Sequence, residues 1–437
     1  MKYQKILSTP TCLVNESHVD RASSKGCYRF FSNVKVTPER IMISHQEKIV
    51  ERCKALGKDI YVIQDTTTIT PSQRYGISKD LGHITRKDSS NKDSGCHSYL
   101  LHNSLCISSD DMPLGLLSQK IYTHNNKSTS LRDSRKQRPI EEKESYRWLE
   151  SLYCCNKLLS DVDSRVIMIS DRESDIYEYL QEANRLEQKV ILRSFTNRNT
   201  TIKGIKLSDF LSNLISCGSY SFIDHNYNNH NIDVFYGKVT FKSPNRSKKS
   251  TSFALSNISY NVIYAKESNV NEDGIEWILL TNIDINDYKQ ALEIIKAYSK
   301  RWHIENFHKV LKTAFRIEDI RLESYEKIQK LATLLSIIAY RLYYLVHIGR
   351  IAPNKSCTTL LSKYEWQSLC LQVKNSIPKT APSISQAITY IAIMGGYFNR
   401  KSDPKPGLIP IWRGWRKLNN IASFFEKTYQ QKDVGNR

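Results

Sequence analysis

The sequence predicts an α/β protein in which a β-rich insertion interrupts the α/β part and a helical region follows. Three observations predict this class. Runs of β-branched and aromatic residues alternate with helix-like segments as far as residue 196. Short alternating segments separated by Asn, Gly, Ser and Pro then occupy 197–275, and long apolar-periodic segments follow from about residue 287.

Each element of the first part follows from its local pattern. Residues 1–50 are polar and helix-like, and residues 125–138 read as a basic loop. Two apolar, β-branched runs, at 59–64 and 165–170, predict buried strands that end at Asp65 and Asp171. The other elements expected before residue 196 are strands at 97–108 and 114–123, helices at 140–158 and 173–186, and a strand at 189–193.

The later elements are read in the same way. Within the insertion, short strands are expected at 220–223, 232–241, 252–255 and 262–265, and a strand at 276–280 closes it. Two long helices are expected at about 287–314 and 325–348. The second is strongly apolar, but polar residues such as Arg341 and His347 interrupt it. It therefore predicts a buried helix and not a membrane span, and no membrane partner is expected.

Composition and charge narrow the class of protein. The chain has 437 residues, of which 40% are hydrophobic and 10% aromatic, which excludes a wholly disordered chain. Lys and Arg total 64 against 44 Asp and Glu, a formal net charge of +20. Such an excess favours a polyanionic partner, most often nucleic acid. A basic surface with no such partner is the alternative that charge alone leaves open.

The cysteines and the first residues indicate a compartment. None of the ten cysteines lies in a Cys-x-x-Cys pair, so the local pattern of a zinc ribbon is absent, and reduced, buried thiols are expected. No apolar stretch follows the first five residues, so we expect no signal peptide. The sequence predicts a cytoplasmic protein.

Two aspartates are candidates for chemistry. Asp65 and Asp171 are each expected directly after a buried strand, and functional residues of open α/β sheets gather just past the strand ends. An aspartate at such a position is also common as a helix N-cap or a turn residue, and this alternative stays open for both.

A stripe of polar residues marks the predicted helix 287–314. At 100° per residue, four side chains fall within about 60° of one another, and Lys309 borders them. The four are Tyr298, Arg301, Glu305 and Lys312. A salt-bridge ladder on a solvated face would show the same stripe. Phosphoryl transfer at DNA would also use it, because a carboxylate binds metal, cations bind phosphates and an aromatic ring contacts a base.

Asp65, Asp171 and Glu305 are together the carboxylate set that two-metal phosphoryl transfer requires. Mg²⁺ and Mn²⁺ prefer oxygen ligands, so such a site needs neither His nor Cys. We therefore expect two Mg²⁺ or Mn²⁺ ions as cofactors, one at the attacking oxygen and one at the leaving oxygen.

With these residues in view, the sequence resembles the IS4-family DDE transposases, particularly the Tn5-like branch. The pattern Tyr298-x₂-Arg301-x₃-Glu305-x₆-Lys312 reproduces that family's signature without a gap. The other matching segments begin at Asp65 (DTT), Glu142 (EKES-x₂-W), Asp171 (DRESDI), Trp277 (W-x-LLT) and Gly395 (GGYF).

The resemblance implies a ribonuclease-H-like catalytic core interrupted by the β-rich insertion. It divides the chain into a helical N-terminal DNA-binding remnant (1–50), the first part of the core (51–196), the insertion (197–275), the remainder of the core with the glutamate helix (276–320) and a helical C-terminal region (321–437). In this family the dimer contact lies in C-terminal helices, which correspond here to about 412–425. The implied partners are double-stranded DNA, both transposon ends and target, and a second copy of the chain, in a bacterial cytoplasm at the nucleoid.

Residue roles carry over by matching position. Asp65, Asp171 and Glu305 would be the metal-binding triad. Tyr298, Arg301 and Lys312 would hold phosphates of the transposon end, and Arg193, His308 and Lys309 would make further end contacts. Trp277 would stack on a base that is flipped out during hairpin formation, with a buried strand tryptophan as the alternative. The implied reaction is cleavage at the element's ends, release through hairpins and joining to target DNA.

Two rival functions remain open. Family members carry a longer helical end-recognition segment before the residues that match Tyr28–Phe30, so this chain is also compatible with an N-terminally truncated, catalytically idle DNA-binding remnant. The other rival is a metal-dependent endonuclease of the same superfamily that does not transpose. The intact carboxylate set disfavours the first rival, and Trp277 with the polar stripe disfavours the second.

Overall fold

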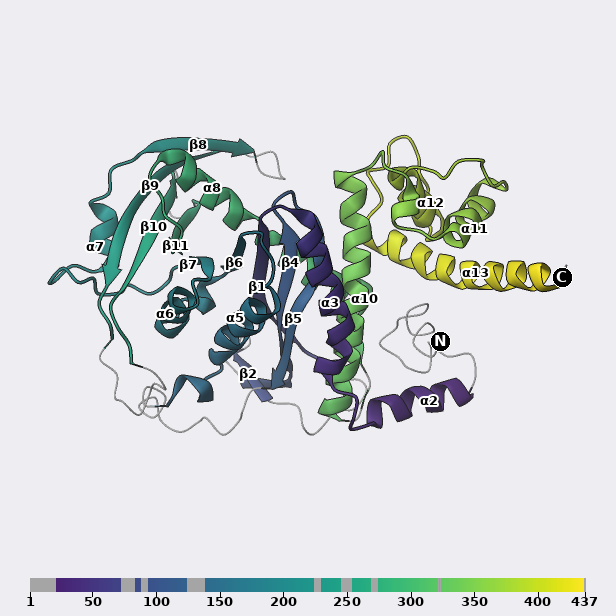
Figure 1. The fold of residues 1–437 in the computed structure, drawn as a ribbon, viewed down its shortest axis with the longest axis horizontal. Helices are drawn as coiled ribbons and strands as arrows, with labels where there is room; N and C mark the ends of the chain where they lie inside the picture. Colours follow the sequence, from purple (N-terminus) through teal and green to yellow (C-terminus); the bar gives the residue numbers. More distant parts are fainter. Residues whose placement is uncertain are drawn as a thin grey trace.

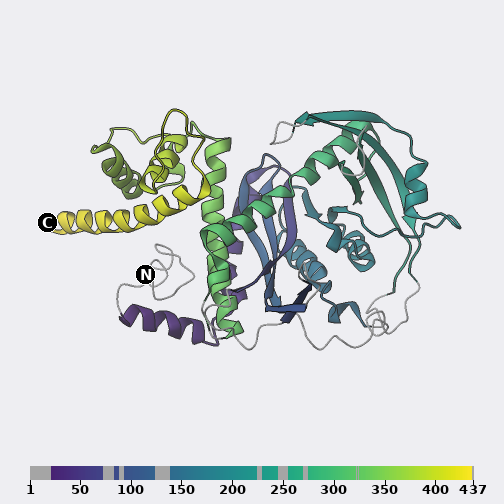
Figure 2. The same ribbon diagram turned by 180° about the vertical axis from the view of Figure 1, so that it is seen from behind.

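The computed structural model describes residues 21–71, 83–87, 93–123, 138–223, 229–244, 254–268, 274–320, 322 and 324–435. Most of the predicted basic loop at 125–138, and residues 1–20 of the predicted N-terminal region, lie outside the described residues. In the described part, a large sheet with helices on both faces is joined by one long helix to a group of C-terminal helices (Figures 1 and 2).

The sheet has nine strands and is mixed. In sheet order they are β5 (Pro113–Thr123), β4 (Tyr99–Ser108), β1 (Ile60–Ile69), β6 (Val166–Ser170), β7 (Lys189–Arg193), β11 (Glu276–Thr281), β10 (Ile258–Glu267), β9 (Asn229–Phe241) and β8 (Gly218–Ile223). Only the β1–β6 and β6–β7 pairs of this sheet are parallel. A separate hairpin pairs β2 (His83–Lys87) with β3 (Asp93–His97).

Helices cover both faces of the sheet and form the C-terminal part. The α-helices are α2 (Arg21–Ser32), α3 (Pro38–Leu56), α5 (Tyr146–Leu158), α6 (Tyr177–Arg185), α7 (Leu207–Ser212), α8 (Tyr288–Ser299), α9 (Trp302–Lys309), α10 (Tyr325–Ile351), α11 (Lys363–Lys374), α12 (Ile384–Met394) and α13 (Leu408–Gly435). Short turns of other helix types are η3 (Ile140–Glu142), η4 (Arg172–Ser174), η6 (Val310–Ala314), η7 (Ile317–Asp319) and η8 (Cys357–Thr359).

Alternate residues of the central strands pack into two cores, one on each face of the sheet. Ile60 and Val62 of β1 pack with helices α5 and α6. Tyr61 and Ile63 point the other way and pack with α8, α9 and α10. Because both faces are covered, the central strands are apolar at successive positions, which is why the sequence reads as continuous hydrophobic runs.

The prediction that the first strand ends at Asp65 is wrong. β1 continues to Ile69 and keeps its pairing with β4 along that whole length, because the residues after Asp65 are three threonines and an isoleucine, all β-branched. The parallel pairing of β1 with β6, however, stops where Ile63 faces Ile169. Asp65 therefore lies just beyond the part of β1 that β6 covers, and Asp171 directly follows the end of β6.

The strands of the predicted insertion join the central sheet. β10 pairs with β11 and β11 with β7, so β8, β9 and β10 lengthen that sheet on one side. Residues 254 and 255 of the predicted strand 252–255 are not in a strand, and helix α7 precedes β8 where no helix was expected. The domain boundaries at 196 and 275 stay predictions.

The single helix predicted at 287–314 is also wrong, because the chain forms α8, α9 and the π-helical turn η6 instead. At the junction, the backbone N–H groups of Arg301 and His303 bond to the carbonyls three residues back. Asp111, in the turn between β4 and β5, anchors this junction. Its Oδ1 accepts from Lys300 Nζ at 2.6 Å and lies 3.2 Å from His303 Nε2.

Helix α10 lies between the sheet and the C-terminal helices in both views (Figures 1 and 2). Among the described residues it is the one helix that is long and apolar enough to cross a membrane. However, 67% of its apolar stretch is buried inside the protein. Its bounds, Tyr325–Ile351, agree with the predicted helix at about 325–348. The prediction of a buried helix is confirmed.

Candidate active site

Asp65 lies on β1 with little contact to solvent. Its Oδ1 accepts a hydrogen bond from the backbone N–H of Thr66 at 2.7 Å, and Oδ2 lies 3.5 Å from Arg301 Nη1. Burial and the neighbouring Asp171 raise the pKa of Asp65 to about 7, against the opposing charge of Arg301. The single charge of Arg301 therefore does not offset the effects of burial and of the neighbouring carboxylate on Asp65.

Asp171 lies one residue past β6 and caps η4. Its Oδ1 accepts from the backbone N–H of Glu173 at 2.9 Å, so the N-cap alternative that the sequence left open is correct for this residue. Capping and metal binding are compatible here because that hydrogen bond engages Oδ1 and a carboxylate has several lone pairs. Burial is also the main cause that raises the pKa of Asp171.

Arg301 contacts both Glu305 on α9 and Asp65 on β1. Its Nη2 donates to Oε1 of Glu305, one turn further along, while Nη1 faces Asp65. The charge of Arg301 also lowers the pKa of Asp171, though less than burial raises it. Two of the three predicted carboxylates, Asp65 and Glu305, thus pair with one guanidinium group, and its charge also acts on the third.

The chemistry of these donors fits a divalent cation, although the side chains are not arranged as a metal site. In the described part of the chain, no three His, Cys, Asp or Glu side chains lie close enough to hold a metal ion together. Asp65, Asp171 and Glu305 offer only oxygen atoms, which Mg²⁺ and Mn²⁺ prefer. Asp171 and Glu305 both raise the pKa of Asp65, which is the repulsion that a bound cation would relieve.

Aromatic and basic residues border the carboxylates on one side. Trp277, on β11, is half-buried and contacts Tyr298 edge-on, with ring centroids 5.3 Å apart. Arg193, on β7, donates to the backbone carbonyl of Glu276 at 2.7 Å. Burial and the charges of Arg172 and Arg301 lower the pKa of Arg193. Repulsion among these arginines marks a place where an anion would be stabilised.

The remaining predicted DNA contacts differ in exposure. Lys309 is exposed and Lys312 is partly exposed. Tyr298 and His308 are buried, and the ring of His308 bonds to Asn103 Nδ2 at 3.0 Å. Burial, with the charges of Lys312 and Arg301, lowers the pKa of His308 to about 3, so it is neutral at physiological pH. A phosphate would reach the two buried side chains only after their neighbours move.

Two arginines near the aspartates were missed as site residues. Arg172 is exposed directly after Asp171. Arg147, on α5, contacts Thr66 and Glu173, which are neighbours in sequence of the two aspartates. The available signal was their position inside the matching segments EKES-x₂-W and DRESDI. Spacing could not reveal the contacts of Arg147, since they join residues 81 and 26 positions apart.

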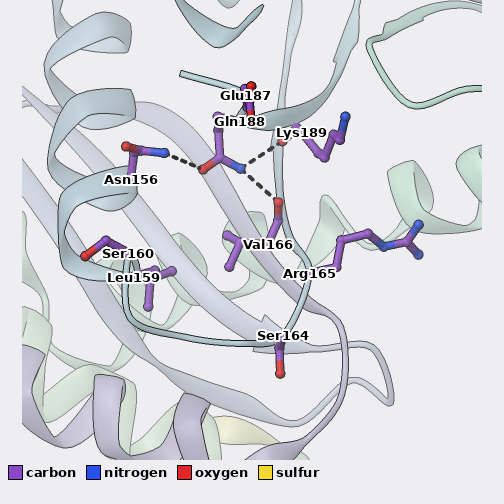
Figure 3. Close-up of a pocket in the computed structure, with 9 residues that line it drawn as sticks. All are labelled: Asn156, Leu159, Ser160, Ser164, Arg165, Val166, Glu187, Gln188 and Lys189. Carbon is purple, nitrogen blue, oxygen red and sulfur yellow. Dashed lines mark hydrogen bonds between the residues drawn. The ribbon is translucent and has the colours of Figure 1, made fainter. Parts of the chain in front are cut away.

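A pocket of about 290 Å³ lies at the other end of the strands (Figure 3). Val166 and Lys189, the first residues of β6 and β7, line it, so it opens at the amino ends of these strands. Gln188 crosses it and bonds to Asn156 and to the carbonyls of Val166 and Lys189 (Figure 3). Functional sites of such sheets lie at the carboxyl ends, so this pocket is separate from the carboxylate cluster.

Two family models match this chain. A family model described as the transposase DDE domain matches residues 154–342, and one described as the transposase Tn5 dimerisation domain matches residues 337–434. The first match includes Asp171 and Glu305 and begins after Asp65. The mixed α/β fold and its ribonuclease-H-like core, as predicted, are therefore confirmed.

Among solved structures, the chain is similar to the piggyBac transposase in a cryo-EM structure of its synaptic complex with hairpin DNA. The TM-score is 0.33 at 9% sequence identity, and the match covers 86% of this chain and 59% of that one. The chain thus spans less than two thirds of the length of that relative. The two family matches overlap at residues 337–342 and together span residues 154–434, and they fit an IS4-family DDE transposase of the Tn5 type.

Proposed function

We propose that this chain is a DNA transposase that cleaves the ends of a mobile element and joins them to target DNA. One observation carries the proposal: Asp65 on β1 and Glu305 on α9 both pair with Arg301, whose charge also lowers the pKa of Asp171 at the end of β6. The match to the transposase DDE domain supports the reaction class, and the charge of +20 supports a DNA partner.

In this proposal the three carboxylates bind Mg²⁺ or Mn²⁺. When bound, such ions activate the attacking oxygen and stabilise the leaving oxygen of phosphoryl transfer. Arg301 exchanges its carboxylate partners for a DNA phosphate, which leaves the oxygens of Asp65 and Glu305 free. Arg172, Arg193, Lys309 and Lys312 bind neighbouring phosphates through charge-assisted hydrogen bonds.

The proposed reaction passes through a hairpin at each end. Trp277 provides the face on which a displaced base stacks, supported from below by the edge-on contact with Tyr298. Two copies of the chain act together, with the dimer contact in the region that matches the Tn5 dimerisation domain, at about 412–425 on α13. Its substrate places the protein at the nucleoid, in the bacterial cytoplasm.

The test is cleavage of labelled duplexes that carry the element's ends, in Mn²⁺ and in Mg²⁺. Asp65→Asn, Asp171→Asn and Glu305→Gln should each abolish cleavage while DNA binding is kept and the melting temperature is not lowered, because each removes a metal ligand from a site with few others. Asp59→Asn is the matched control, since Asp59 pairs with Arg165 at the opposite end of the same two strands.

Two outcomes would overturn the proposal. End binding without any cleavage by the wild-type protein would indicate the idle DNA-binding remnant. Cleavage of any duplex with no joining of the 3′ ends to a target would indicate the endonuclease. Near-wild-type cleavage by one of the three variants would remove that residue from the triad.

A further inference from the structure

Arg147 bridges the two chain segments that carry the aspartates. It lies at the start of α5, directly before the buried Trp148. Its Nε donates to Oγ1 of Thr66 at 3.0 Å, and its Nη2 donates to Oε2 of Glu173. Thr66 follows Asp65 in the chain, and Glu173 lies two residues after Asp171.

Each partner of Arg147 in turn holds one aspartate. The backbone N–H of Thr66 donates to Oδ1 of Asp65 at 2.7 Å, and the backbone N–H of Glu173 donates to Oδ1 of Asp171 at 2.9 Å. One guanidinium group is therefore connected to both carboxylates by two similar paths, each with a single intermediate residue. These paths leave the Oδ2 atoms of the two aspartates unused.

The guanidinium of Arg147 is itself held in place. Its side chain is 11% exposed, and it lies over the rings of Tyr122 and Trp148 at 5.6 and 5.8 Å. Nη1 donates to the carbonyl of Glu144 at 2.7 Å. The planar fork of an arginine keeps its donors at fixed angles, which a lysine cannot reproduce. Arg301 differs, because it contacts the carboxylates of Asp65 and Glu305 directly.

We propose that Arg147 is a positioning residue that sets the separation of the Asp65 and Asp171 carboxylates. The inference rests on the proposed function, since it assumes that these carboxylates bind metal. Arg147 also draws the carboxylate of Glu173 away from the triad, so that a fourth acid next to Asp171 does not become a ligand. Outer partners of this kind orient the ligands of metal sites and change affinity without touching the ion.

The test measures Mn²⁺ binding directly, by the electron paramagnetic resonance signal of free Mn²⁺, on the full chain with a duplex of element-end sequence. Arg147→Met keeps an apolar stem beside the two rings and removes the donors to Thr66, Glu173 and Glu144. We expect its Mn²⁺ affinity to fall by about 10- to 100-fold. Arg147→Lys should recover only part of the loss, because one ammonium group cannot reach both partners in the same geometry.

The matched control is Arg165→Gln. Arg165 also ties β1 to β6 through a carboxylate, that of Asp59, but at the amino ends of the strands. Its loss should leave Mn²⁺ affinity unchanged. Glu173→Gln should weaken Mn²⁺ binding less than Arg147→Met does. The double variant should have the same Mn²⁺ affinity as Arg147→Met, because the contribution of Glu173 depends on its contact with the arginine.

A purely structural role predicts a different pattern. Arg147→Met would then lower the melting temperature and reduce cleavage equally at every Mn²⁺ concentration. If Arg147 is a positioning residue, saturating Mn²⁺ should restore most of the cleavage rate of Arg147→Met. The variant and the wild-type protein should then bind DNA with equal affinity. Wild-type protein that binds Mn²⁺ and cleaves, beside an Arg147→Met variant with unchanged Mn²⁺ affinity, would overturn this inference alone. Wild-type protein that neither binds Mn²⁺ nor cleaves would overturn the proposed function.

Discussion

Asp65 holds its proton at a pH where an ordinary carboxyl group has lost it. Burial and Asp171 raise its pKa from 3.8 to about 7, so between these values the folded protein binds a proton that the unfolded chain does not. This contribution to stability is fully present below about pH 4 and is lost as the pH rises through about 7. Metal ligands must be deprotonated, so a bound cation would lower the raised pKa of Asp65.

We expect the melting temperature of the metal-free protein to decline from about pH 5 to pH 8 more steeply than that of Asp65→Asn, because the variant cannot ionise at this position. Circular dichroism melts of both proteins in chelator measure this difference. Added Mg²⁺ should raise the wild-type melting temperature more at about pH 8 than at pH 5. Identical pH profiles for the two proteins would contradict the assigned cause.

Trp277 offers a second test at the level of one side chain. If it stacks on a flipped base, Trp277→Ala should spare the first nick and reduce hairpin formation by about five- to a hundredfold, because base–aromatic stacking is worth ~1–3 kcal/mol. Trp277→Phe should recover most of the loss. Gel assays of nicks and hairpins on one preparation measure both steps.

A core role for the same tryptophan has another consequence. Truncation of a buried tryptophan to alanine costs roughly 3–5 kcal/mol of stability, so nicking and hairpin formation would decline together with the melting temperature. The half-buried position of Trp277 over Tyr298 makes the melting temperature a necessary part of the measurement.

Helices α12 and α13 cross at two glycines. A Cβ atom at Gly395 would lie 1.8 Å from the carbonyl oxygen of Pro410, and one at Gly414 would lie 1.6 Å from that of Ile391. Both contacts are with backbone atoms, which cannot turn aside. The two helices can therefore approach this closely only where neither has a side chain.

We expect Gly414→Ala to destabilise the C-terminal helices by about 1–3 kcal/mol or more, although alanine normally favours a helix over glycine by ~1 kcal/mol. Chemical denaturation followed by tryptophan fluorescence would measure this, since Trp412 and Trp415 lie beside the crossing. Gly407→Ala is the control, because a Cβ there meets no atom within 4 Å. Equal stability of the two variants would show that the helices can separate without cost.

The elements that the sequence predicted correctly are those whose pattern is local. The strands at β6 and β7 and helix α10 follow from apolar runs and periodicity alone. The break between α8 and α9 does not, because Asp111, in a distant turn, anchors Lys300 and His303 there. The length of β1 beyond Asp65 likewise depends on its pairing with β4.

For the candidate site, the sequence pattern predicted which residues to consider but not which residues they contact. Asp65, Asp171 and Glu305 were predicted because each lies in a recognisable segment. In the structure Asp65 and Glu305 pair with Arg301, and Asp171 raises the pKa of Asp65, while the metal-binding triad stays a prediction. The solvated face that was the alternative reading of the polar stripe does not fit all of its members, since Tyr298 is buried while Arg301 remains partly exposed. The break before α9 is one reason that simple helical angles fail there.

At the scale of the whole molecule, the net charge of +20 predicts how DNA binding responds to salt. If about six phosphates are neutralised, the affinity for duplex DNA should fall on the order of a thousandfold between about 50 and 200 mM salt. Lys309→Gln should reduce the slope of log affinity against log salt concentration by about one. Without this exposed lysine, binding would neutralise one phosphate fewer and release about one counterion fewer. Fluorescence anisotropy at several salt concentrations measures both, and a flat dependence would contradict a phosphate-based interface.

The order of the three carboxylates along the chain has a consequence for how the protein is made. Roughly 240 residues separate Asp65 from Glu305, which a ribosome adding ~5–20 residues per second needs about 10–50 s to translate. During that interval the nascent polypeptide already contains both aspartates and the first strands of the sheet, yet it lacks the glutamate. If the proposed function holds, a chain released early, before α9, would lack one of the three carboxylates, and the capacity to cut DNA would arise only in the last third of synthesis.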